Sequence, residues 1–483
     1  MAPPNAASEL LRHHDQEHLL AFYDELPPDR QASLLAQVDQ IDFDRLDRLI
    51  RSHVLTAPES TLPEDLAPAR IAPPGPRPDD TAGADRPFPP TEAAYEAGRR
   101  RGEELISAGK VAALVVAGGD GTRLGYEGPK GCLPITPVKR KPLFQVFAEQ
   151  ILATRRRYGA PVPWYVMTSV TNDEATREFF AANDNWGLPA EDVFFFRQGR
   201  MPAIGLDGKI LLAEKDQIAW NPDGHGGCLP ALRASGALEN MAGRGVEQIS
   251  YFQVDNPLVR CVDPLFIGLH AERGAEMSAK ALPKRSPHER VGNFCRSGGK
   301  TIVIEYSDLP DELAEQCGPD GRLRFSAGSI AIHVFSRSFV ERLTDQAELP
   351  LPFHRAVKKV SCIIPTGQAV TPSEPNAVKL ERFIFDAMPL AQETLVLETV
   401  RSEEFSPVKN ATGSDSPTTC LHDQVARAAG WLEAAGVTIP CDADGNVAAA
   451  IEISPLFALD ERELAGKVAA DLEIKPGDGV CLE

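Results

Sequence analysis

Residues 114–131 read LVVAGGDGTRLGYEGPKG, and this stretch decides the fold that the sequence predicts. It begins inside an apolar run, Val111–Ala117, which has no polar face, so we expect a buried strand of a parallel sheet. The run leads directly into Gly118, Gly119 and Gly121. Glycines at this point let the backbone turn sharply and present its N–H groups to a phosphate at close range. The stretch therefore predicts a strand followed by a phosphate-binding turn.

Two cations in the same loop, Arg123 and Lys130, favour a polyphosphate ligand over a purely structural glycine turn. The spacing excludes both common phosphate motifs. The dinucleotide motif G-x-G-x-x-G needs a third glycine where Leu124 stands. The Walker motif G-x-x-x-x-G-K-[ST] allows neither Pro129 before the lysine nor Gly131 after it. The loop therefore indicates a polyphosphate site of another type.

The composition is that of an ordinary globular protein, with 43% hydrophobic and 25% charged residues. A length of 483 residues predicts two or three domains or subdomains. The net charge of −19 argues against a nucleic-acid partner. Nine scattered cysteines without a C-x-x-C pair, together with no visible signal peptide, predict reduced thiols and a cytoplasmic protein. No apolar run is long enough to predict a membrane span.

The chain divides into four predicted regions. Residues 1–56 carry helical patterns and predict an N-terminal helical cap, whose expected role is packing or oligomerisation. Residues 57–90 are proline-rich and predict an extended linker. Thr91 is placed to cap the first helix of a catalytic domain, residues 91–419. Residues 420–483 predict a small C-terminal subdomain. The sequence leaves monomer and homodimer equally open.

Strands and helices alternate through the predicted catalytic domain, which indicates an α/β fold with a mostly parallel sheet covered on both faces. The expected strands are Val111–Ala117, Trp164–Ser169, Val193–Phe196, Ile249–Val254, Thr301–Tyr306, Ile330–Phe335 and Leu395–Val400. The expected helices are Leu143–Tyr158, Asp173–Asn183, Pro264–Arg273 and Lys379–Gln392. Because ligands of such sheets bind at the carboxyl ends of strands, the glycine loop lies where a ligand is expected.

Two further segments carry possible chemistry. Residues 249–256, ISYFQVDN, form an apolar strand that ends in Asp255. A carboxylate there suits Mg²⁺ between phosphate oxygens, although Asp255 could instead cap a following helix. Residues 221–227, NPDGHGG, form a glycine-rich turn around His225. The turn is either a simple connection or a place where backbone approaches a ligand.

Two charged residues are ambiguous on sequence alone. Lys409 lies in FSPVKN, residues 405–410, and is either a phosphate ligand or an ordinary exposed lysine. The charged run before it, Arg401–Glu404, predicts a solvated surface. Glu305 ends the TIVIEY strand and is either an acceptor for sugar hydroxyls or an ordinary edge charge.

Taken in order, these segments resemble the eukaryote-type UDP-N-acetylhexosamine pyrophosphorylases, within the UTP–sugar-1-phosphate uridylyltransferases. The resemblance spans about residues 8 to 420. It rests on Gly118–Gly125, Pro129–Gly131, Trp164–Ser169, Arg197–Gly199, Pro222–Gly227, Val254–Asn256, Asp263–Gly268, Glu305–Ser307, Lys379–Asp386 and Glu404–Asn410. It implies a GT-A-like, Rossmann-like nucleotidyltransferase core that uses Mg²⁺, with flanking N- and C-terminal subdomains.

The resemblance also implies roles for individual residues. Arg123, Lys130 and Lys409 would act on the phosphates as catalytic residues. Asp255 would bind both nucleotide and metal. The other nucleotide-binding residues would be Ala117, Gly118, Gly119, Gln198 and Gly199, the last two selecting uracil. The sugar-binding residues would be His225, Gly226, Glu305, Ser326, Gly328 and Lys379.

Three positions depart from the family pattern. His225 stands where the N-acetylhexosamine branch has Asn-Gly-Gly, and the glucose branch has a His-Gly pair there. Residues 326–329 read Ser-Ala-Gly-Ser in place of Asn-Ala-Gly-Asn, and Asp120 replaces the more usual Gln. The first two departures lie in the expected sugar pocket, so they bear on the choice of sugar and leave uridylyl transfer untouched.

The sequence therefore predicts an enzyme that makes a UDP-sugar and pyrophosphate from UTP and a sugar 1-phosphate. N-acetylglucosamine 1-phosphate is the first expected sugar, and the alternative is glucose 1-phosphate or a broad specificity for sugar 1-phosphates. A catalytically inactive sugar-nucleotide sensor is the rival from another class, disfavoured by the retained Lys130, Asp255 and Lys409. A nicotinamide dehydrogenase is a third hypothesis, weakened by the broken dinucleotide motif.

Overall fold

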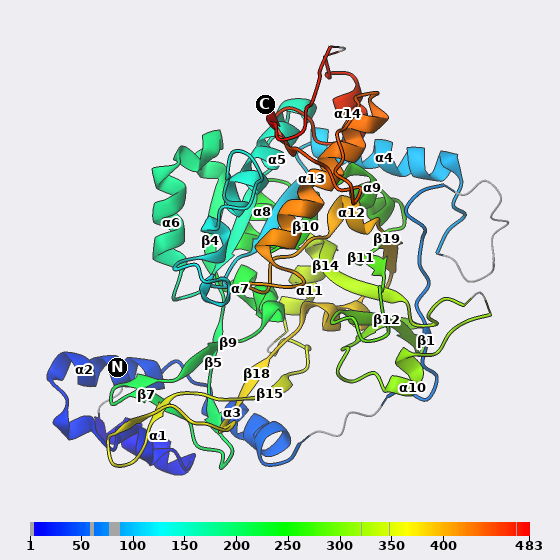
Figure 1. The fold of residues 1–483 in the computed structure, drawn as a ribbon. Coiled ribbons are helices and arrows are strands. Elements are labelled where there is room, and N and C mark those ends of the chain that lie inside the picture. Colours follow the sequence, from blue (N-terminus) through cyan, green and yellow to red (C-terminus); the bar gives the residue numbers. More distant parts are fainter. Residues whose placement is uncertain (1–3, 58–61, 77–86, 320, 347, 470) are drawn as a thin grey trace. The chain divides into compact units, whose positions relative to one another are not determined.

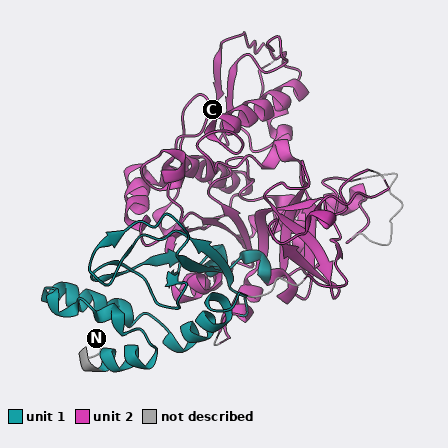
Figure 2. Cartoon of the chain, turned by 60° about the horizontal axis from the view of Figure 1, so that its bottom comes forward, with its two compact units in different colours: residues 1–61, 198–228, 350–386 teal, residues 62–197, 229–349, 387–483 magenta. Residues whose placement is uncertain are grey.

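The computed structural model describes residues 4–57, 62–76, 87–319, 321–346, 348–469 and 471–483. The chain forms two compact units, coloured separately in Figure 2. Unit 1 comprises residues 1–61, 198–228 and 350–386, and unit 2 comprises residues 62–197, 229–349 and 387–483. Each unit is therefore assembled from three segments that are far apart in the sequence.

Unit 2 is built on a ten-stranded sheet, counted over the described residues (Figure 1). Its main path runs β1-β12-β14-β10-β2-β3-β4, with β11 joining β14 to β19 and β13 pairing with β12. The strands are β1 Ala67–Pro68, β2 Val111–Val116, β3 Trp164–Thr168, β4 Val193–Arg197, β10 Gln248–Gln253, β11 Met277–Pro283, β12 Gly292–Ser297, β13 Lys300–Ile304, β14 Ala327–Ser336 and β19 Thr394–Glu398.

The sheet is mixed, so the expectation of a mostly parallel sheet is only partly correct. Strands β10, β2, β3 and β4 are parallel, as expected from their helical crossovers. Strand β14 runs antiparallel to both β10 and β11, and β12 pairs antiparallel with β13. For β12 and β13 the reason is local, because they are joined by Gly298 and Gly299, a two-residue connection that only antiparallel neighbours can use.

Helices of unit 2 follow the predicted pattern closely. They are α4 Glu92–Ser107, α5 Leu143–Tyr158, α6 Asp173–Ala182, α8 Ala237–Gly243, α9 Pro264–Glu272, α10 Asp311–Ala314, α11 Arg337–Thr344, α12 Arg401–Glu404, α13 Pro417–Ala434 and α14 Glu461–Ala465; α7 is Cys228–Ala234. The side chain of Thr91 caps α4 by accepting a hydrogen bond from the Ala94 N–H. The main core of the unit is a mixture of aliphatic and aromatic side chains, and among the aromatic ones Phe144, Phe147, Trp164 and Phe252 are at most 1% exposed.

The last part of unit 2 has an apolar cluster of its own. It joins α13 to the parallel pair β20 Ala450–Ile453 and β21 Gly479–Leu482. Trp431 and Leu432 of α13 pack there with Ile451 and Leu464.

Unit 1 combines the N-terminal helices with short strands. The helices are α1 Pro4–His13, α2 Pro28–Val38 and α3 Phe43–Leu49. The strands are β5 Arg200–Pro202, β6 Ile204–Gly205, β7 Leu212–Glu214, β8 Gln217–Ile218, β9 Trp220–Pro222, β15 His354–Lys358, β16 Cys362–Ile363, β17 Ala369–Val370 and β18 Ala377–Glu381. An apolar core holds the two together, with Leu11, Leu46 and Ile50 from the helical part packed with Ile204 and Leu380.

The helix expected over Lys379–Gln392 is wrong. Residues Ala377–Glu381 form β18, which pairs with β15 and β6, and Ile384–Leu390 form a 3₁₀ turn that contains Pro389. Pairing with strands distant in the sequence decides the conformation here, as it commonly does for short apolar segments.

The proline-rich stretch is partly outside the described residues, at 58–61 and 77–86. Where it is described it is extended and attached to the sheet of unit 2. Strand β1 pairs with β12, and Ala72 is fully buried, with its N–H donating to the Val396 carbonyl at 2.8 Å.

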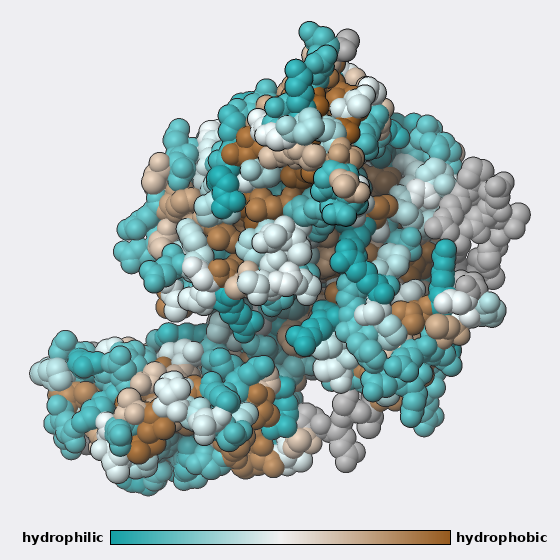
Figure 3. Space-filling model, in the orientation of Figure 1, coloured by the Kyte–Doolittle hydropathy of each residue, from teal (hydrophilic) through white to brown (hydrophobic). Residues whose placement is uncertain are grey.

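Hydrophilic side chains cover most of the face shown in Figure 3. The large apolar side chains that are exposed, among them Leu55, Val170 and Val400, are distant from one another in sequence. Within the described ranges, no helix combines the length and apolar character needed to cross a bilayer.

Candidate active site

The loop after β2 is closed on itself by backbone hydrogen bonds. The Gly121 N–H donates to the Gly128 carbonyl at 2.8 Å, and the Lys130 N–H donates to the Gly119 carbonyl at 3.1 Å. These bonds hold both ends of the loop at the carboxyl end of β2, the position expected for a ligand site in an α/β sheet.

The glycines do not all act as expected. The left-handed positions of the loop are Gly125 at φ +71° and Gly128 at φ +130°, whereas Gly118, Gly119 and Gly121 adopt ordinary backbone angles. Gly119 is distinguished by the open space around it, because a Cβ placed on it would have no heavy atom within 4 Å. The backbone is therefore open to a ligand at Gly119, while the turning is done further along.

Asn172 fixes the start of the loop, and sequence reasoning missed it. Its side-chain Nδ2 donates to the carbonyls of Ala117 at 3.1 Å and Gly119 at 3.4 Å, and its Oδ1 accepts from the Ser169 N–H at 2.8 Å. Asn172 is buried just before α6, so these bonds are shielded from water. A polar residue just after the β3 strand was the signal that could have identified it.

The two loop cations are placed differently. Arg123 is exposed and makes no hydrogen bond or ion pair with any described residue, so its guanidinium is available to an anion. Lys130 is half-buried, and its Nζ lies 3.5 Å from the Val408 carbonyl oxygen. Lys130 thereby connects the glycine loop to the segment that carries Lys409.

Asp255 lies beside this loop because β10 is the parallel neighbour of β2. The Val254 N–H donates to the Val116 carbonyl at 3.1 Å, and the Asp255 carbonyl accepts from the Val408 N–H at 2.8 Å. The Asp255 carboxylate is half-exposed and bonds to none of the residues that the structure describes. The alternative that Asp255 caps a helix is wrong, because the next helix, α9, is capped by Asp263.

Lys409 is exposed, and its backbone N–H donates to the Asp415 carbonyl at 2.7 Å. The structure thus brings Lys130, Asp255 and the Lys409 segment together, with Val408 bonded to the first two. The charged run before this segment is not a solvated surface as expected. It forms α12, and Glu404 is only 4% exposed.

Three residues expected to bind the sugar lie in the β12–β14 region of unit 2. A Cβ atom built on Gly292 would lie 3.7 Å from Glu305 Oε1 and 3.7 Å from Ser329 Cβ. Gly328 pairs with Asn293 on β12, and the Ser326 carbonyl accepts from the Lys284 N–H at 2.8 Å. Glu305 and the 326–329 stretch are therefore neighbours in space.

The remaining predicted residues belong to unit 1, where Gln198 and Gly199 meet the 221–227 turn. The Gln198 Nε2 donates to the Gly224 carbonyl at 2.7 Å, and the Asp223 N–H donates to the Gly199 carbonyl at 3.2 Å. A Cβ on Gly199 would lie 2.5 Å from Asp223 Oδ2, and one on Gly227 would lie 2.0 Å from Oδ1. A side chain at either position would therefore displace the Asp223 carboxylate from its present place.

Asp223 itself was not singled out from the sequence. Its side chain is 8% exposed, and its Oδ1 has no hydrogen-bond partner among the described residues. Burial raises the pKa of this carboxyl to about 6, against the lowering effect of the nearby Gln198. A buried carboxyl in this turn is a feature that only the packing reveals.

His225 is a neutral, tightly held ring. Its Nδ1 lies 3.1 Å from the backbone nitrogen of Ile384, whose N–H donates to it, and its ring stacks on Phe383 with centroids 5.3 Å apart. Burial lowers the pKa of His225 to about 4. Because Nδ1 accepts a hydrogen bond, the ring proton is on Nε2, which makes Nε2–H the donor available to a ligand.

The last two residues predicted to bind the sugar, Gly226 and Lys379, also belong to unit 1. The Gly226 N–H donates to the Arg382 carbonyl at 2.8 Å. Lys379 is half-buried on β18, opposite Ala356 of β15, and not on a helix.

Comparison with known proteins identifies relatives of this chain. Residues 93–416 match the model of the UTP–glucose-1-phosphate uridylyltransferase family. The chain is 40% identical over 484 residues to the human UDP-N-acetylhexosamine pyrophosphorylase-like protein 1, covering 95% of this chain and 93% of that protein. It is 38% identical over 378 residues to the Saccharomyces cerevisiae UDP-N-acetylglucosamine pyrophosphorylase, covering 74% and 79%.

The fold is similar to that of a solved relative. The crystal structure of the uridine diphosphate N-acetylglucosamine pyrophosphorylase from Trypanosoma brucei matches with a TM-score of 0.80 at 26% sequence identity. The match covers 96% of this chain and 95% of that one, so both units have counterparts there.

Proposed function

This chain belongs to the UTP–glucose-1-phosphate uridylyltransferase family, and we propose that it makes a UDP-sugar and pyrophosphate from UTP and a sugar 1-phosphate. The observation that carries the proposal is the convergence on Val408, whose backbone bonds to both Lys130 and Asp255. The glycine loop that carries Lys130, the strand end that carries Asp255 and the segment that carries Lys409 are thereby joined through Val408. We assign residues 91–419 to the catalytic domain, with a GT-A-like core.

The reaction needs positioning and charge neutralisation more than it needs proton transfer. An oxygen of the sugar 1-phosphate attacks the α-phosphorus of UTP, the new P–O bond forms, and the bond to the β-phosphate breaks to release pyrophosphate. The attacking oxygen is already an anion, so no general base is required. Lys130, Arg123 and Lys409 would hold the phosphates in line and neutralise their charge.

Asp255 is the residue that fits a magnesium ion. Its carboxylate is half-exposed and has no bond within the described residues. Mg²⁺ is commonly bound by one or two carboxylates, with substrate phosphates and water completing the octahedron. A single carboxylate beside a phosphate loop matches that donor set, and the ion would supply charge neutralisation on the phosphate oxygens. Among the described residues, no three His, Cys, Asp or Glu side chains gather in a way that could hold a metal ion.

The nucleoside and sugar would be recognised by the other predicted residues. Ala117, Gly118 and Gly119 would contact the uridine through their backbone, and Gln198 with Gly199 would select uracil. Glu305 would accept from sugar hydroxyls, with Ser326, Gly328, His225, Gly226 and Lys379 completing the sugar contacts. The nine unpaired thiols fit an enzyme of a reducing compartment such as the cytoplasm.

We propose N-acetylglucosamine 1-phosphate as the sugar substrate, because the yeast and Trypanosoma relatives carry that name. Glucose 1-phosphate is the second candidate. It is favoured by one observation, that the donor at position 225 is an imidazole N–H, where the N-acetylhexosamine pattern has an asparagine amide.

The experiment is pyrophosphate release by the full chain with UTP, Mg²⁺ and a panel of sugar 1-phosphates. The panel holds N-acetylglucosamine, N-acetylgalactosamine, glucose and galactose, and the controls replace UTP with each other nucleoside triphosphate or remove the metal with EDTA. Preference for N-acetylglucosamine 1-phosphate supports the proposal. Preference for glucose or galactose transfers the proposal to that sugar. No release with any sugar contradicts it and favours a sugar-nucleotide sensor.

A further inference from the structure

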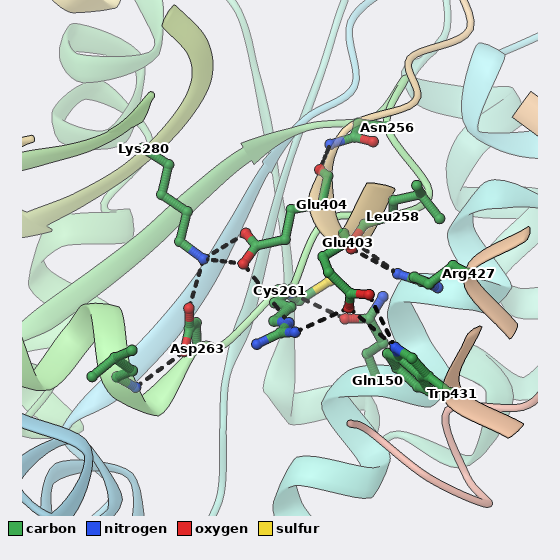
Figure 4. Close-up of polar contacts among 12 residues, drawn as sticks. Gln150, Asn256, Leu258, Cys261, Asp263, Lys280, Glu403, Glu404, Arg427 and Trp431 are labelled. Atoms are coloured by element: carbon green, nitrogen blue, oxygen red, sulfur yellow. Dashed lines mark hydrogen bonds and ion pairs between the residues drawn. The ribbon is translucent and has the colours of Figure 1, made fainter. Parts of the chain in front are cut away.

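A buried ionic cluster surrounds Glu403 and Glu404 at the end of α12, immediately before residues 405–410 in the chain (Figure 4). Lys280 of β11 is 1% exposed, and its Nζ lies 2.6 Å from Asp263 Oδ2. The same Nζ lies 2.6 Å from Glu404 Oε1 and 2.5 Å from Oε2. The β11–β14 register shifts beside Lys280, and the extra residues are on β14, between Ser329 and His333, while β11 itself stays in regular register with β19.

A second half of the cluster extends to α13. Arg260 lies 3.3 Å from Glu403 Oε2 and 3.7 Å from Glu404 Oε1. The Trp431 Nε1 donates to Glu403 at 3.1 Å, and Arg427 Nη1 donates to the Glu403 carbonyl at 3.1 Å. Three cations thus face three carboxylates, and Figure 4 shows both glutamates between the two groups of partners.

Stability alone does not explain this cluster. Burying charges is costly, and apolar residues of similar volume stabilise a core at least as well. Although burial acts to raise the pKa of Asp263, Lys280 and Arg260 outweigh it and hold that pKa below its ordinary value. The Asp263 carboxyl therefore stays ionised. A cluster of hydrogen-bonded charge pairs is better suited to fixing one arrangement of the backbone that carries it.

The backbone next to this cluster is that of residues 405–410, the segment that contains Lys409. Glu404 ends α12 and is followed at once by Phe405–Asn410. The Asn256 side chain bonds to both sides of the junction between α12 and this segment. Its Nδ2 donates to the Glu404 carbonyl at 2.7 Å, and its Oδ1 accepts from the Ser406 N–H at 3.0 Å. One step further along, the Val408 N–H donates to the Asp255 carbonyl at 2.8 Å.

We propose that Glu404, held by Lys280, is a positioning residue that sets the register of residues 405–410 against Asp255 and so places Lys409 for uridylyl transfer. The inference rests on the proposed function for its last step only. The register itself is a property of the fold and is measurable without substrate.

The test compares Glu404→Gln with Glu149→Gln, a matched control. Glu149 is equally buried and pairs with Lys141 at 3.0 Å, but its other bonds go to Gln145 and Ser454. The first readout is hydrogen exchange of the 405–410 amides. We expect exchange at Ser406 and Val408 to become at least about tenfold faster in Glu404→Gln and to stay unchanged in Glu149→Gln. Equal protection in both variants overturns the proposal.

The second readout is turnover. We expect Glu404→Gln to lower kcat by about 10- to 100-fold with little change in the KM for UTP, because a misplaced cation weakens positioning more than binding. Glu149→Gln should keep its kcat even if its thermal midpoint falls as far. A Glu404→Gln enzyme with loosened exchange and normal kcat also overturns the proposal.

If Glu404→Gln does not fold, Glu404→Asp is compared with Glu149→Gln by the same two measurements, hydrogen exchange and turnover. Wild-type protein inert toward every sugar phosphate would contradict the proposed function, and the exchange data would still decide the register.

Discussion

Two buried ionisable residues of the 221–227 turn oppose each other in their dependence on pH. Burial raises the pKa of Asp223 from 3.8 to about 6, so the native state favours its neutral form. Burial lowers the pKa of His225 from 6.5 to about 4, so the native state again favours the neutral form. Asp223 therefore contributes stability at low pH that is lost as pH rises through about 6. His225 contributes stability that is lost as pH falls from about 6.5 towards 4.

The Asp223 effect predicts a variant that is more stable at high pH. Asp223→Asn keeps the shape but removes the buried charge, so it should raise the free energy of unfolding by up to about 3 kcal/mol at pH 8. The gain should shrink towards zero near pH 4, where the wild-type carboxyl is neutral. Thermal melts at pH 8 and pH 4.5 measure both, with the exposed Asp24→Asn as control. The same gain at both pH values would contradict the assignment.

We predict that Lys130 is required for catalysis. Lys130→Ala removes the half-buried cation that connects the glycine loop to Val408, so kcat for pyrophosphate release should fall by roughly 10²–10³. Steady-state kinetics at saturating UTP and sugar 1-phosphate measures the loss. Lys475→Ala removes a lysine whose side chain is 74% exposed and should leave kcat unchanged. Near-normal turnover of Lys130→Ala would remove this residue from the mechanism.

Helices α4 and α9 pack with their backbones very close together, because glycines lie at the point where the two helices meet. A Cβ on Gly268 of α9 would lie 1.6 Å from the Gly98 carbonyl oxygen of α4, and one on Gly102 would lie 1.8 Å from the Pro264 carbonyl oxygen. The contact positions α9 directly after Asp263, a member of the ionic cluster. Glycine is required here for close approach, since neither helix has room for a methyl group.

A pair of Gly→Ala variants tests this element. Gly268→Ala should lower the free energy of unfolding by about 1–3 kcal/mol or more, because the two backbones must separate. Gly430→Ala, in the middle of α13 with nothing within 4 Å of its Cβ position, should instead raise it by up to about 1 kcal/mol. Chemical denaturation of both variants gives the two signs. Equal effects would show that helix propensity alone is being measured.

For the whole molecule, the main fact is that neither unit is continuous in sequence. Unit 1 takes residues 198–228 and 350–386 from the middle of the chain and joins them to the N-terminal helices. The predicted site residues are divided accordingly, with Gln198, His225 and Lys379 in unit 1 and Lys130 and Asp255 in unit 2. Composition and periodicity describe neighbours along the chain, so they gave no sign of this division.

The cysteines give a prediction for the whole molecule. All nine are free thiols, and five of them are buried: Cys132, Cys228, Cys261, Cys295 and Cys420. Burial raises the pKa of Cys132 to about 12, which suppresses its reactive thiolate. A colourimetric thiol titration without reductant should therefore detect at most four thiols in the native protein, the exposed Cys317 and Cys441 reacting first. In denaturant it should detect nine. Fewer than nine in denaturant would indicate a disulfide.

The sequence by itself determined the elements whose side-chain pattern is set by near neighbours. Strands β2, β3, β4 and β10 lie where apolar runs predicted them, and α5 has the predicted bounds, Leu143–Tyr158. The positions of the glycine loop and of the strand-end Asp255 followed from the same runs, because a buried parallel strand delivers its next residues to the edge of the sheet where ligands of such folds usually bind. The motifs that carried the family resemblance are all of this local kind.

Only the tertiary structure decided what depends on distant partners. Strand β18 stands where a helix was expected because β15 and β6 pair with it. Glu404 is buried because Lys280, 124 residues away, neutralises it. The neutral state of His225 and the raised pKa of Asp223 come from burial, which sequence spacing does not report. Burial and long-range pairing are properties of the packed chain, and they set both the charge state and the register of the site.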